Sequence, residues 1–590
     1  MIRPRLPLRT PFLSMALLLA GLALTLSGHP QQAFSQSTRP YTFFPQTQFP
    51  LETIFIQGDQ PGPTVMVQGG IQGDEPAGYL TAELLSRARV LRGNLIVVPR
   101  ANLPAILART RSVNVDLNRR FDTDYHQFYE DTLARAIRFL VRQSDALIHL
   151  HEGSGFYNPV YIDSLRNPKR YGQSLIIDTA VFQNRIFLAR TVKQVLPPLN
   201  AEIVPATYRF QLFNTRTHSQ SSQHPEQRKS LTYFALQEAN IPAVAVEVSK
   251  DIASLEWKIR HQFRATQKLL QQFGVDIVFP ELARIVAQQA LQPEAAECTV
   301  NGQALTAVHG STLDLKSPLS FACSSSPDSS FSPKLGLYAT NGHGQNLLQA
   351  TRTLMLHPED TLRLVADGTS LHSYSLDWSE ADLPVHYFSK PIFVCSLNGD
   401  LRLIPAGDEL EAVEGDRLVL HGIWNGQPGE ILNLKGYVSQ AGYNNGQDAG
   451  HEIVLYPEIF IRRYLLPSNH PGDWRCEVVR ETKGKKNSKM TIRVLPRKVR
   501  GITLRSEKDR SFVLPFEPGA QCSLQPGSYT LENVLAKEGD SLVCPVMQGR
   551  PRSWGQAFSL REGETTTLQL FLATTFEPLG QMTFSGNKRY

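Results

Sequence analysis

Residues 36–292 alternate between short apolar stretches of strand length and longer stretches with apolar residues at helical spacing. The strand candidates are Thr64–Gln68, Asn94–Pro99, Ala146–His151 and Ala243–Val248. The helix candidates, in which apolar residues recur at threes and fours, are Gly78–Ala88, Tyr129–Arg142, Thr179–Leu196, Leu231–Glu238 and Leu255–Phe273. This alternation predicts an α/β domain with a mixed, mainly parallel sheet flanked by helices. Ligand sites in such sheets form beyond the carboxyl ends of the strands.

The character of the chain changes after the helical pattern around Pro280–Leu291. Short alternating strands follow, separated by turns of Gly, Pro, Asn and Asp, and this pattern predicts all-β, sandwich-like modules. At 590 residues the chain is too long for one core. Turns and cysteine positions place boundaries near Glu294, Pro391 and Val499, which gives an α/β domain at 36–292 and β modules at 293–390, 391–498 and 499–590.

Residues 1–35 have the organisation of a secretory signal peptide. A basic start with Arg3, Arg5 and Arg9 precedes the apolar stretch Met15–Leu26, and Ala33-Phe-Ser35 supplies a small-x-small cleavage signal. The apolar stretch is shorter than the roughly 20 residues of a membrane span. We therefore expect an exported protein, cleaved near Ser35, with no stable membrane span after cleavage.

Six cysteines all follow residue 297, and an even number in an exported chain favours disulfides. Sequence does not determine their connectivity. Sequential pairing would place one bridge in each β module, as Cys298 with Cys323, Cys395 with Cys476, and Cys522 with Cys544. The formal net charge of +6 is small for this length, so a nucleic-acid partner is not expected.

The turn Gly69-Gly-Ile-Gln-Gly-Asp-Glu75 follows an apolar strand and precedes a helix that begins near Pro76. Gln72 and Glu75 lie three residues apart, so both side-chain oxygens can be directed at one point. Alone, this spacing suits a metal site and a plain polar turn about equally well.

Three further stretches are expected to place side chains at the same carboxyl edge of the sheet as Gln72 and Glu75. In Ala146-Leu-Ile-His-Leu-His151 the last residue is a candidate metal ligand, whereas His149 is expected to be buried and hydrogen-bonded. Arg109–Phe121 packs four arginines around an Asn-Arg pair, and arginine binds carboxylates with two parallel hydrogen bonds. Glu247 stands in the apolar strand Ala243–Val248, where a carboxylate is costly unless it is paired or catalytic.

Taken together, Gln72-x-x-Glu75, Asp116-x-Asn118-Arg119, His151 and Glu247 resemble the zinc carboxypeptidase superfamily over roughly residues 50–275. The pattern of that carboxypeptidase A-like superfamily is His-x-x-Glu, an Asn-Arg pair, a His and a late Glu. Gln72 departs from it by replacing the first His. Glutamine at that ligand, the export signal and the β modules are similar to one branch, the murein DL-carboxypeptidases that determine curved or helical shape in Gram-negative bacteria.

The resemblance implies a periplasmic enzyme that trims a peptidoglycan tripeptide to a dipeptide and releases diaminopimelate. It implies one Zn²⁺ per chain, bound by Gln72, Glu75 and His151, with Glu247 as general base and later general acid. Three protein ligands leave zinc an open position, where the pKa of water falls toward about 7. A glutamine oxygen is a weaker donor than imidazole, so we expect zinc to be held less tightly.

The same resemblance implies that Asn118 and Arg119 hold the terminal carboxylate of the substrate. Arg111, eight residues before Arg119, has the spacing of the arginine that polarises the scissile carbonyl in related deacylases. Asp116 would contact the metal ligands without binding the metal itself. The tyrosine that clamps the substrate in the superfamily has no secure counterpart here, with Tyr208 and Tyr233 as candidates.

Two other functions remain open on the sequence. A zinc amidohydrolase of the deacylase type, cleaving an N-acyl amino acid, could use Arg111 and Arg119 equally well. A catalytically inactive cell-wall scaffold would result if Gln72 abolished metal binding, although retention of Glu75, His151, Glu247 and Arg119 argues against it. The β modules could orient the catalytic domain on the cell wall, cover its mouth or bind a cell-shape protein.

Overall fold

The computed structural model describes residues 36–282, apart from 46 and 281, and residues 296–587 with short gaps. Those gaps are 301–302, 306–310, 313–320, 326–332, 341–345, 350–360, 378–389, 399, 424–429, 439–445, 469, 471, 482–486, 498–500, 509–510, 517–518, 537–538, 542, 548–556 and 573–574. The expected signal peptide, and most of the helical pattern at Pro280–Leu291, lie outside the described residues. No described helix is long and apolar enough to cross a membrane.

A nine-stranded mixed sheet forms the centre of the α/β domain, in the order β1-β2-β4-β3-β5-β10-β8-β9 with β11 beside β4. Its central strands β4, β3, β5 and β10 are parallel, which confirms the predicted fold class. The strands are β1 (Ser37–Phe43), β2 (Leu51–Gln57), β3 (Gln60–Gln68), β4 (Arg89–Val98), β5 (Ala146–Gly153), β8 (Ser174–Ile177), β9 (Gln211–Asn214), β10 (Ala243–Ser249) and β11 (Asp276–Val278). Two short strands, β6 (Phe156–Tyr157) and β7 (Arg166–Asn167), pair outside it.

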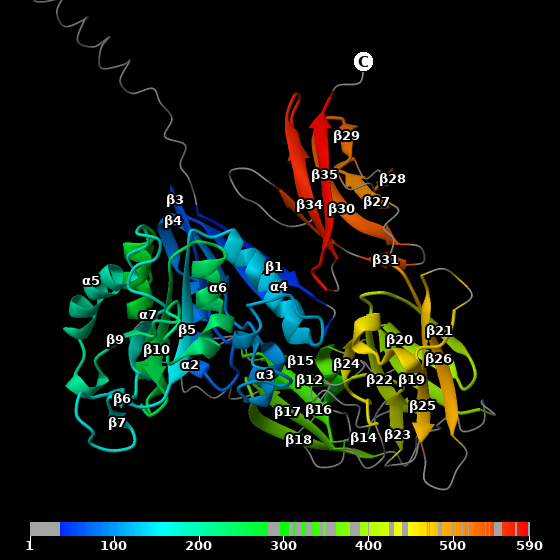
Figure 1. The fold of residues 1–590 in the computed structure, drawn as a ribbon, viewed down its shortest axis with the longest axis horizontal. Helices are drawn as coiled ribbons and strands as arrows, with labels where there is room; N and C mark the ends of the chain where they lie inside the picture. The colour runs from blue at the N-terminus through cyan, green and yellow to red at the C-terminus, as the bar shows by residue number, and fades with distance from the viewer. Residues whose placement is uncertain are drawn as a thin grey trace, which may run out of the picture.

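Helices cover both faces of this sheet (Figure 1). One apolar core joins the sheet to α2 (Pro76–Leu85), α5 (Leu188–Asn200) and α7 (Leu255–Gln272). A second core, on the other face, joins it to α4 (Tyr129–Arg142) and α6 (Leu231–Gln237). The remaining helical segments of the domain are α3 (Leu103–Ala108), η1 (Leu117–Arg119), η2 (Ala206–Tyr208) and η3 (Pro225–Lys229).

Strand alternation decides which core each side chain faces. Leu147 of β5 and Ala243 of β10 belong to the core under α4 and α6. His149 and His151 share the face of Leu147, and Glu247 shares the face of Ala243. The chemically distinctive residues of both strands therefore lie on the α4 and α6 side of the sheet.

The helix predicted over Thr179–Leu196 was wrong in its first half, because α5 begins only at Leu188. Gln183 and Asn184 have φ angles of 48° and 54°. Phe182 and Ile186 pair across the turn that these residues make. Left-handed residues cannot continue a right-handed helix, so the apolar spacing before Leu188 does not become helical.

Three all-β stretches follow, and each contains two sheets. The first has β12 (Ala296–Val300), β13 (Gln303–Leu305), β14 (Ser311–Thr312), β15 (Phe321–Ser325), β16 (Leu335–Ala339), β17 (Thr361–Ala366) and β18 (Thr369–Asp377). The second has β19 (Ile392–Leu397), β20 (Asp400–Pro405), β21 (Glu409–Val413), β22 (Arg417–Ile423), β23 (Ile431–Leu434), β24 (Glu452–Val454), β25 (Trp474–Glu481) and β26 (Ser488–Leu495). The third has β27 (Gly501–Ser506), β28 (Ser511–Pro515), β29 (Gln521–Leu524), β30 (Gly527–Ala536), β31 (Gly539–Ser541), β32 (Val543–Met547), β33 (Ala557–Leu560), β34 (Thr565–Leu572) and β35 (Pro578–Gly586).

The three β modules share one strand connectivity. In each, the first two strands pair antiparallel, as do the last two. The third strand pairs parallel with the last, in β14 with β18, β21 with β26 and β29 with β35. In the second and third modules one apolar core lies between the two sheets, as the predicted sandwiches require. The module boundaries themselves stay a prediction.

Cys298 and Cys323 form the disulfide predicted for the first module, across neighbouring residues of β12 and β15. The predicted bridge between Cys395 and Cys476 is wrong, because both are free thiols. They lie in different sheets of the second module, inside its apolar core. A bridge between two packed sheets forms only where the two Cα atoms come within about 6.8 Å of each other, and here the two thiols stay separate within the core.

Cys522 is also a free thiol, so its predicted bridge to Cys544 is wrong as well. The two cysteines belong to β29 and β32, which are opposite edges of one sheet with β35 and β34 between them. Strands are about 4.8 Å apart, so these edges are separated by about 14 Å. No disulfide reaches across that distance.

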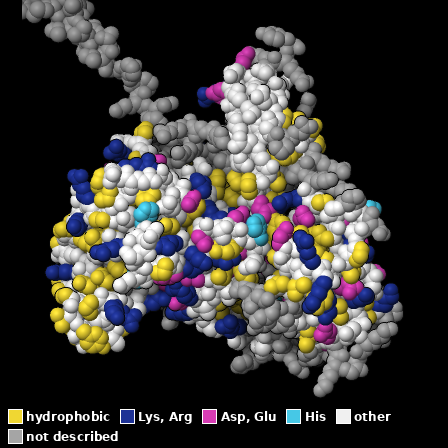
Figure 2. All heavy atoms as spheres, viewed as in Figure 1, with side chains coloured by type: hydrophobic (Ala, Val, Ile, Leu, Met, Phe, Trp, Pro, Cys, Tyr) yellow, Lys and Arg dark blue, Asp and Glu magenta, His cyan; other side chains and the backbone are white. Residues whose placement is uncertain are grey.

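Charge is spread over the molecule without a dominant sign. On the face shown in Figure 2, basic and acidic side chains are interspersed across the α/β domain and the β modules. This distribution agrees with the small net charge of +6.

Candidate active site

The turn Gly69–Glu75 joins β3 to α2 and presents two polar side chains at the carboxyl edge of the sheet. A Cβ on Gly73 would come within 2.0 Å of the backbone of α3, and one on Gly69 within 2.4 Å of the backbone of α2. Only glycine therefore allows the turn to pack this closely. Gln72 and Glu75 are 2% and 3% exposed, so both are held inside the protein.

Glu75 and His151 meet directly, although they are 76 residues apart in sequence. Oε2 of Glu75 lies 3.0 Å from Nδ1 of His151 and also accepts a hydrogen bond from the backbone N–H of Glu152 at 3.1 Å. Burial alone would lower the pKa of His151, but the hydrogen bond and charge of Glu75 raise it. Nε2 of His151 faces Nδ1 of His149 at 3.1 Å. His149 is fully buried and hydrogen-bonded, as expected.

Asp116 joins Gln72 to Arg111. The Gln72 amide nitrogen donates to Oδ1 and Oδ2 of Asp116 at 3.3 and 3.4 Å. Arg111 donates to Oδ2 of the same carboxylate from Nε at 3.1 Å and from Nη2 at 2.8 Å. Burial acts to raise the pKa of Asp116, but Arg111 and Arg119 lower it below its usual value, so the carboxylate stays charged. The amide nitrogen of Gln72 is thereby turned toward Asp116.

Glu247 lies beside His151 in the pairing of β10 with β5. Its Oε2 is buried and has no hydrogen-bond partner among the described residues. Burial raises the pKa of Glu247 to about 7, against the lowering effect of His151. A Cβ on Gly153 would come within 2.8 Å of this oxygen, so the glycine keeps space beside it. The positive charge of Arg111 acts to lower the pKa of both Glu247 and His151.

Arg119 and Asn118 lie on η1, and the structure gives them different surroundings. Oδ1 of Asn118 accepts the backbone N–H of Leu231 at 3.0 Å, so this side chain holds the start of α6. Arg119 is half-buried and makes no salt bridge with any residue that the structure describes. Burial lowers its pKa, partly offset by the charge of Asp116. A half-buried guanidinium without a salt bridge can pair with the carboxylate of a ligand.

Two of the three expected zinc ligands, Glu75 and His151, lie side by side. Tetrahedral ligand atoms about 2.0–2.2 Å from zinc lie about 3.3 Å from each other, and Glu75 and His151 present their donor atoms 3.0 Å apart. Because the nitrogen of Gln72 points to Asp116, its oxygen remains for the metal. Within the described ranges, no group of three or more His, Cys, Asp or Glu side chains could hold a metal ion. The expected set has only two residues of these types, since its third is Gln72.

Sequence reasoning missed two lysines that support the site. Glu152 accepts the backbone N–H of Ala77 and Nζ of Lys258, both at 2.6 Å, which ties the first turn of α2 to β5 and α7. Lys250 binds Asp74 at 2.6 Å and lies 3.7 Å from Oε1 of Glu75. Glu152 follows His151 directly, so strand alternation could have placed it on the α2 side. Nothing in the sequence pattern indicated the lysines.

Comparisons with known proteins point to the same domain. Residues 51–281 match the model of a family described as "Carboxypeptidase controlling helical cell shape catalytic". Over 108 residues the chain is 37% identical to N-alpha-acetyl-L-2,4-diaminobutyric acid deacetylase of Halomonas elongata. That alignment covers 17% of this chain and 31% of the deacetylase, so the chain spans about a third of this curated relative.

Solved structures with a similar fold include the tripeptide-bound cell shape determinant Csd4 of Helicobacter pylori. It is 22% identical, with a TM-score of 0.42, and the match covers 74% of this chain and 95% of that one. A succinylglutamate desuccinylase/aspartoacylase of Rhodobacter sphaeroides is 17% identical, with a TM-score of 0.29 and coverage of 43% and 70%. The family match is the comparison that covers the whole α/β domain: over residues 51–281 this chain is similar to the catalytic domain of the carboxypeptidases that control helical cell shape.

Proposed function

We propose that this protein is a periplasmic zinc carboxypeptidase that trims peptidoglycan stem peptides. Its substrate would be the tripeptide L-Ala-γ-D-Glu-diaminopimelate, cleaved to the dipeptide with release of diaminopimelate. One observation carries the catalytic part of this proposal. Glu247 holds a buried carboxylate oxygen without a partner among the described residues, next to the pair of Glu75 and His151.

Gln72, Glu75 and His151 would hold the zinc ion, which when bound acts as a Lewis acid and lowers the pKa of water toward about 7. For Nδ1 of His151 to bind the metal, its ring proton must lie on Nε2. That proton is then donated to Nδ1 of His149, 3.1 Å away. Asp116 keeps the amide of Gln72 from turning its nitrogen toward the metal.

Glu247 would accept a proton from the attacking water at Oε2 and return it to the leaving amine. Burial raises the pKa of Glu247 to about 7, and the positive charge of a bound zinc ion would act to lower it. Arg111 uses Nε and Nη2 to bind Asp116, and Nη1 is left for the carbonyl oxygen of the scissile bond. Because Asp116 stays ionised, it keeps that guanidinium in place.

Arg119 would hold the terminal carboxylate of the substrate. A guanidinium makes two parallel hydrogen bonds to a carboxylate, which fixes the chain end in position relative to the reacting carbonyl. Asn118 contributes by anchoring the start of α6 beside Arg119. Diaminopimelate and the γ-linkage rest on the resemblance to the murein DL-carboxypeptidases, and the matching family model is described as a carboxypeptidase that controls helical cell shape.

The second candidate is a zinc deacylase that cleaves an N-acyl amino acid. Its support is the 37% identity to a deacetylase over 108 residues. Both reactions need a base and a carboxylate-binding arginine, so Glu247 and Arg119 serve either one. The two candidates differ in the substrate that they accept.

Incubation of the zinc-loaded protein with purified muropeptides, followed by mass analysis, separates these candidates. Loss of tripeptides with an equal gain of dipeptides and free diaminopimelate is the expected result. Intact tripeptides together with cleavage of N-acetyl amino acids would assign the deacylase reaction instead. No turnover of either substrate by the zinc-loaded protein would support the inactive scaffold.

Arg119→Lys should lower kcat/KM on the tripeptide by about tenfold or more, because an ammonium cannot reproduce the two parallel hydrogen bonds. Arg190→Lys, at an exposed arginine on α5, is the matched control and should behave as wild type. Equal kcat/KM for both variants would remove Arg119 from the proposed substrate site.

A further inference from the structure

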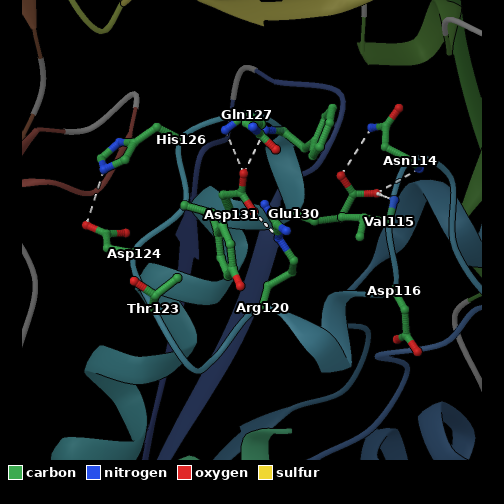
Figure 3. Close-up of polar contacts among 12 residues, drawn as sticks. Asn114, Val115, Asp116, Arg120, Thr123, Asp124, His126, Gln127, Glu130 and Asp131 are labelled. Carbon is green, nitrogen blue, oxygen red and sulfur yellow. Dashed lines mark hydrogen bonds and ion pairs between the residues drawn. The ribbon is translucent and has the colours of Figure 1, made fainter. Parts of the chain in front are cut away.

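The segment Arg109–Asp116, called here the arginine loop, depends on one carboxylate of α4 (Figure 3). Oε1 of Glu130 accepts the backbone N–H groups of Asn114 at 3.0 Å and Val115 at 3.3 Å. Oε2 accepts the side-chain amide of Asn114 at 3.1 Å. Glu130 is fully buried, whereas Asn114 is exposed. The helix therefore fixes the middle of the loop. The start of the loop is held separately, by the hydrogen bonds from Gly73 N–H to the Thr110 oxygen and from Arg109 to Thr369 of the first module.

The arginine loop ends at the residue that organises the site. Asp116 directly follows Val115 and binds both Gln72 and Arg111. A change in the backbone at Asn114 and Val115 would therefore displace the carboxylate that orients the Gln72 amide. Glu130 itself touches none of the expected metal ligands in any contact that the structure describes, so it acts on them only through the loop.

The second β module holds the same turn of α4 from the other side. Arg417 donates from Nη2 to Oγ1 of Thr132 at 2.7 Å, only two residues after Glu130. Arg417 is 2% exposed, and it also pairs with Glu452. Its guanidinium lies 4.3 Å from the ring centroid of Phe49. The hydrogen bond to Thr132, the ion pair with Glu452 and the ring of Phe49 together fix the position of the Arg417 guanidinium. The contact between the second module and α4 therefore has a defined geometry.

The third β module continues the contact along α4. Arg135 donates from Nη1 to the backbone oxygen of Thr575 at 3.1 Å. Phe139 packs against the rings of Phe571 and Phe576 at centroid distances of 5.5 and 5.4 Å. Phe576 belongs to the same apolar core as α4 and α6. Thr132, Arg135 and Phe139 are spaced by three and four residues, so one face of the helix meets the modules.

We propose that α4 is a strut through which the β modules hold the arginine loop in its working position, with Glu130 as the positioning residue. In this arrangement the modules are part of the catalytic architecture. One face of the helix docks on the second and third modules, and its first turn holds the loop that carries Arg111 and Asp116. The inference rests on the proposed function for its effect on turnover, but its structural part can be measured without substrate.

Hydrogen exchange of the peptide covering the arginine loop measures the structural part. The amides of Asn114 and Val115 are protected by Glu130. In the full-length protein, Glu130→Met removes both acceptors while keeping the apolar stem, and should speed exchange of these amides by about tenfold or more. Zinc affinity should fall as well, because the loop carries the Asp116 carboxylate that orients the Gln72 ligand. In the zinc-saturated variant, kcat/KM on the tripeptide should fall by a similar factor.

Two variants separate positioning from a general loss of stability. Glu130→Gln keeps Oε1 for both backbone donors and replaces only the acceptor of the Asn114 amide, so its changes in exchange and kcat/KM should be no larger than those of Asn114→Ala. Asn114→Ala, at an exposed position, removes one of the three hydrogen bonds and should give the same changes as Glu130→Met at smaller size. Unchanged loop exchange in both Glu130→Met and Asn114→Ala would overturn the positioning role.

The contribution of the modules is tested at Thr132. Thr132→Val removes the acceptor of Arg417 without changing the shape of the side chain, and should raise loop exchange and lower kcat/KM by about threefold. Thr191→Val, on α5 and away from the modules, is the matched control. Identical loop exchange in the two variants would overturn the strut. Absence of carboxypeptidase activity in the wild type would refute the proposed function, while the exchange data would still decide on the strut.

Discussion

Glu247 is the residue whose surroundings say most about its role. It stands in a strand whose neighbours are buried and apolar, and one of its oxygens has no partner among the described residues. Leaving a buried carboxylate unpaired costs stability, so a protein keeps one chiefly where it is used. Burial raises its pKa to about 7, which allows it to accept and return a proton near neutral pH.

Glu247→Gln should keep zinc and substrate affinity but lower kcat by about 100-fold or more, since general acid–base catalysis contributes about that much. Glutamine preserves the shape and size of the side chain, but it cannot accept and return a proton. Steady-state kinetics with zinc analysis of the same sample check this expectation. A kcat equal to that of the wild type would make Glu247 a structural residue.

Metal binding at the residue scale can be tested by removing one donor at a time. Gln72→Ala and His151→Ala should each lose zinc, because each leaves only two ligands. His149→Ala should retain zinc, because its ring meets His151 on the nitrogen away from Glu75. Elemental analysis after dialysis measures the zinc content of each variant. Loss of zinc in His149→Ala alone would assign His149, rather than His151, as the ligand.

Among the elements, α4 combines packing with support of the site. Its amphipathic pattern over Tyr129–Arg142 was predicted with its exact limits. What the pattern did not indicate is that Glu130, a polar residue of the first turn, is buried and binds the arginine loop. Acidic residues at a helix start are ordinarily explained by the helix dipole, and here the carboxylate also has a tertiary partner.

Burial of Glu130 predicts a pH-dependent stability. Its pKa is raised from an ordinary value of 4.5 to about 7, mainly by burial and despite the hydrogen bonds from Asn114. The folded state therefore binds the proton more tightly than the unfolded state, so this group's contribution to stability falls as pH rises from about 4.5 to about 7.

Glu130→Gln cannot ionise and should reduce that loss. Comparing its Tm with that of the wild type at pH 5 and at pH 8 measures the effect, and the variant should gain relative to the wild type at the higher pH. The reverse order, with the variant gaining at pH 5, would contradict the assigned direction.

At the scale of the whole molecule, three modules of one connectivity follow a catalytic domain of a different class. Their cores are separate from one another, yet the second and third modules both contact α4. The first module contacts the domain too, since Arg100 donates to both oxygens of Asp367 at 3.2 and 2.9 Å. All three β modules are therefore docked on the α/β domain, as Figure 1 shows for their arrangement along one side.

Cysteine labelling tests the module structure. With alkylation in denaturant without reductant, Cys395, Cys476 and Cys522 should be labelled, and Cys298 and Cys323 should be protected by their bridge. In the folded protein Cys395 and Cys476 should resist labelling, because both are buried and burial raises their pKa. Peptide mass analysis reads each site, and a bridge between Cys395 and Cys476 would contradict the packing of the second module.

Local pattern was enough to predict the four central parallel strands and the residues at their ends, but not the strands β1, β2, β8, β9 and β11. Alternation in Ala146–His151 and the turn at Gly69–Glu75 predicted which side chains share a face or an edge, and the structure brings Glu75 and His151 into contact. These features depend on periods of two or about 3.6 residues, which are visible in any single sequence.

Only the tertiary structure decided what depends on distant partners. One predicted disulfide fails because sheet order separates Cys522 from Cys544, and another because Cys395 and Cys476 stay apart in different sheets. The predicted start of α5 fails because two left-handed residues make a turn. The roles of Lys258, Glu130 and Arg417 come from contacts with residues 15 to 285 positions away. A sequence pattern carries no record of such contacts, because their free energy arises only when separate elements pack together.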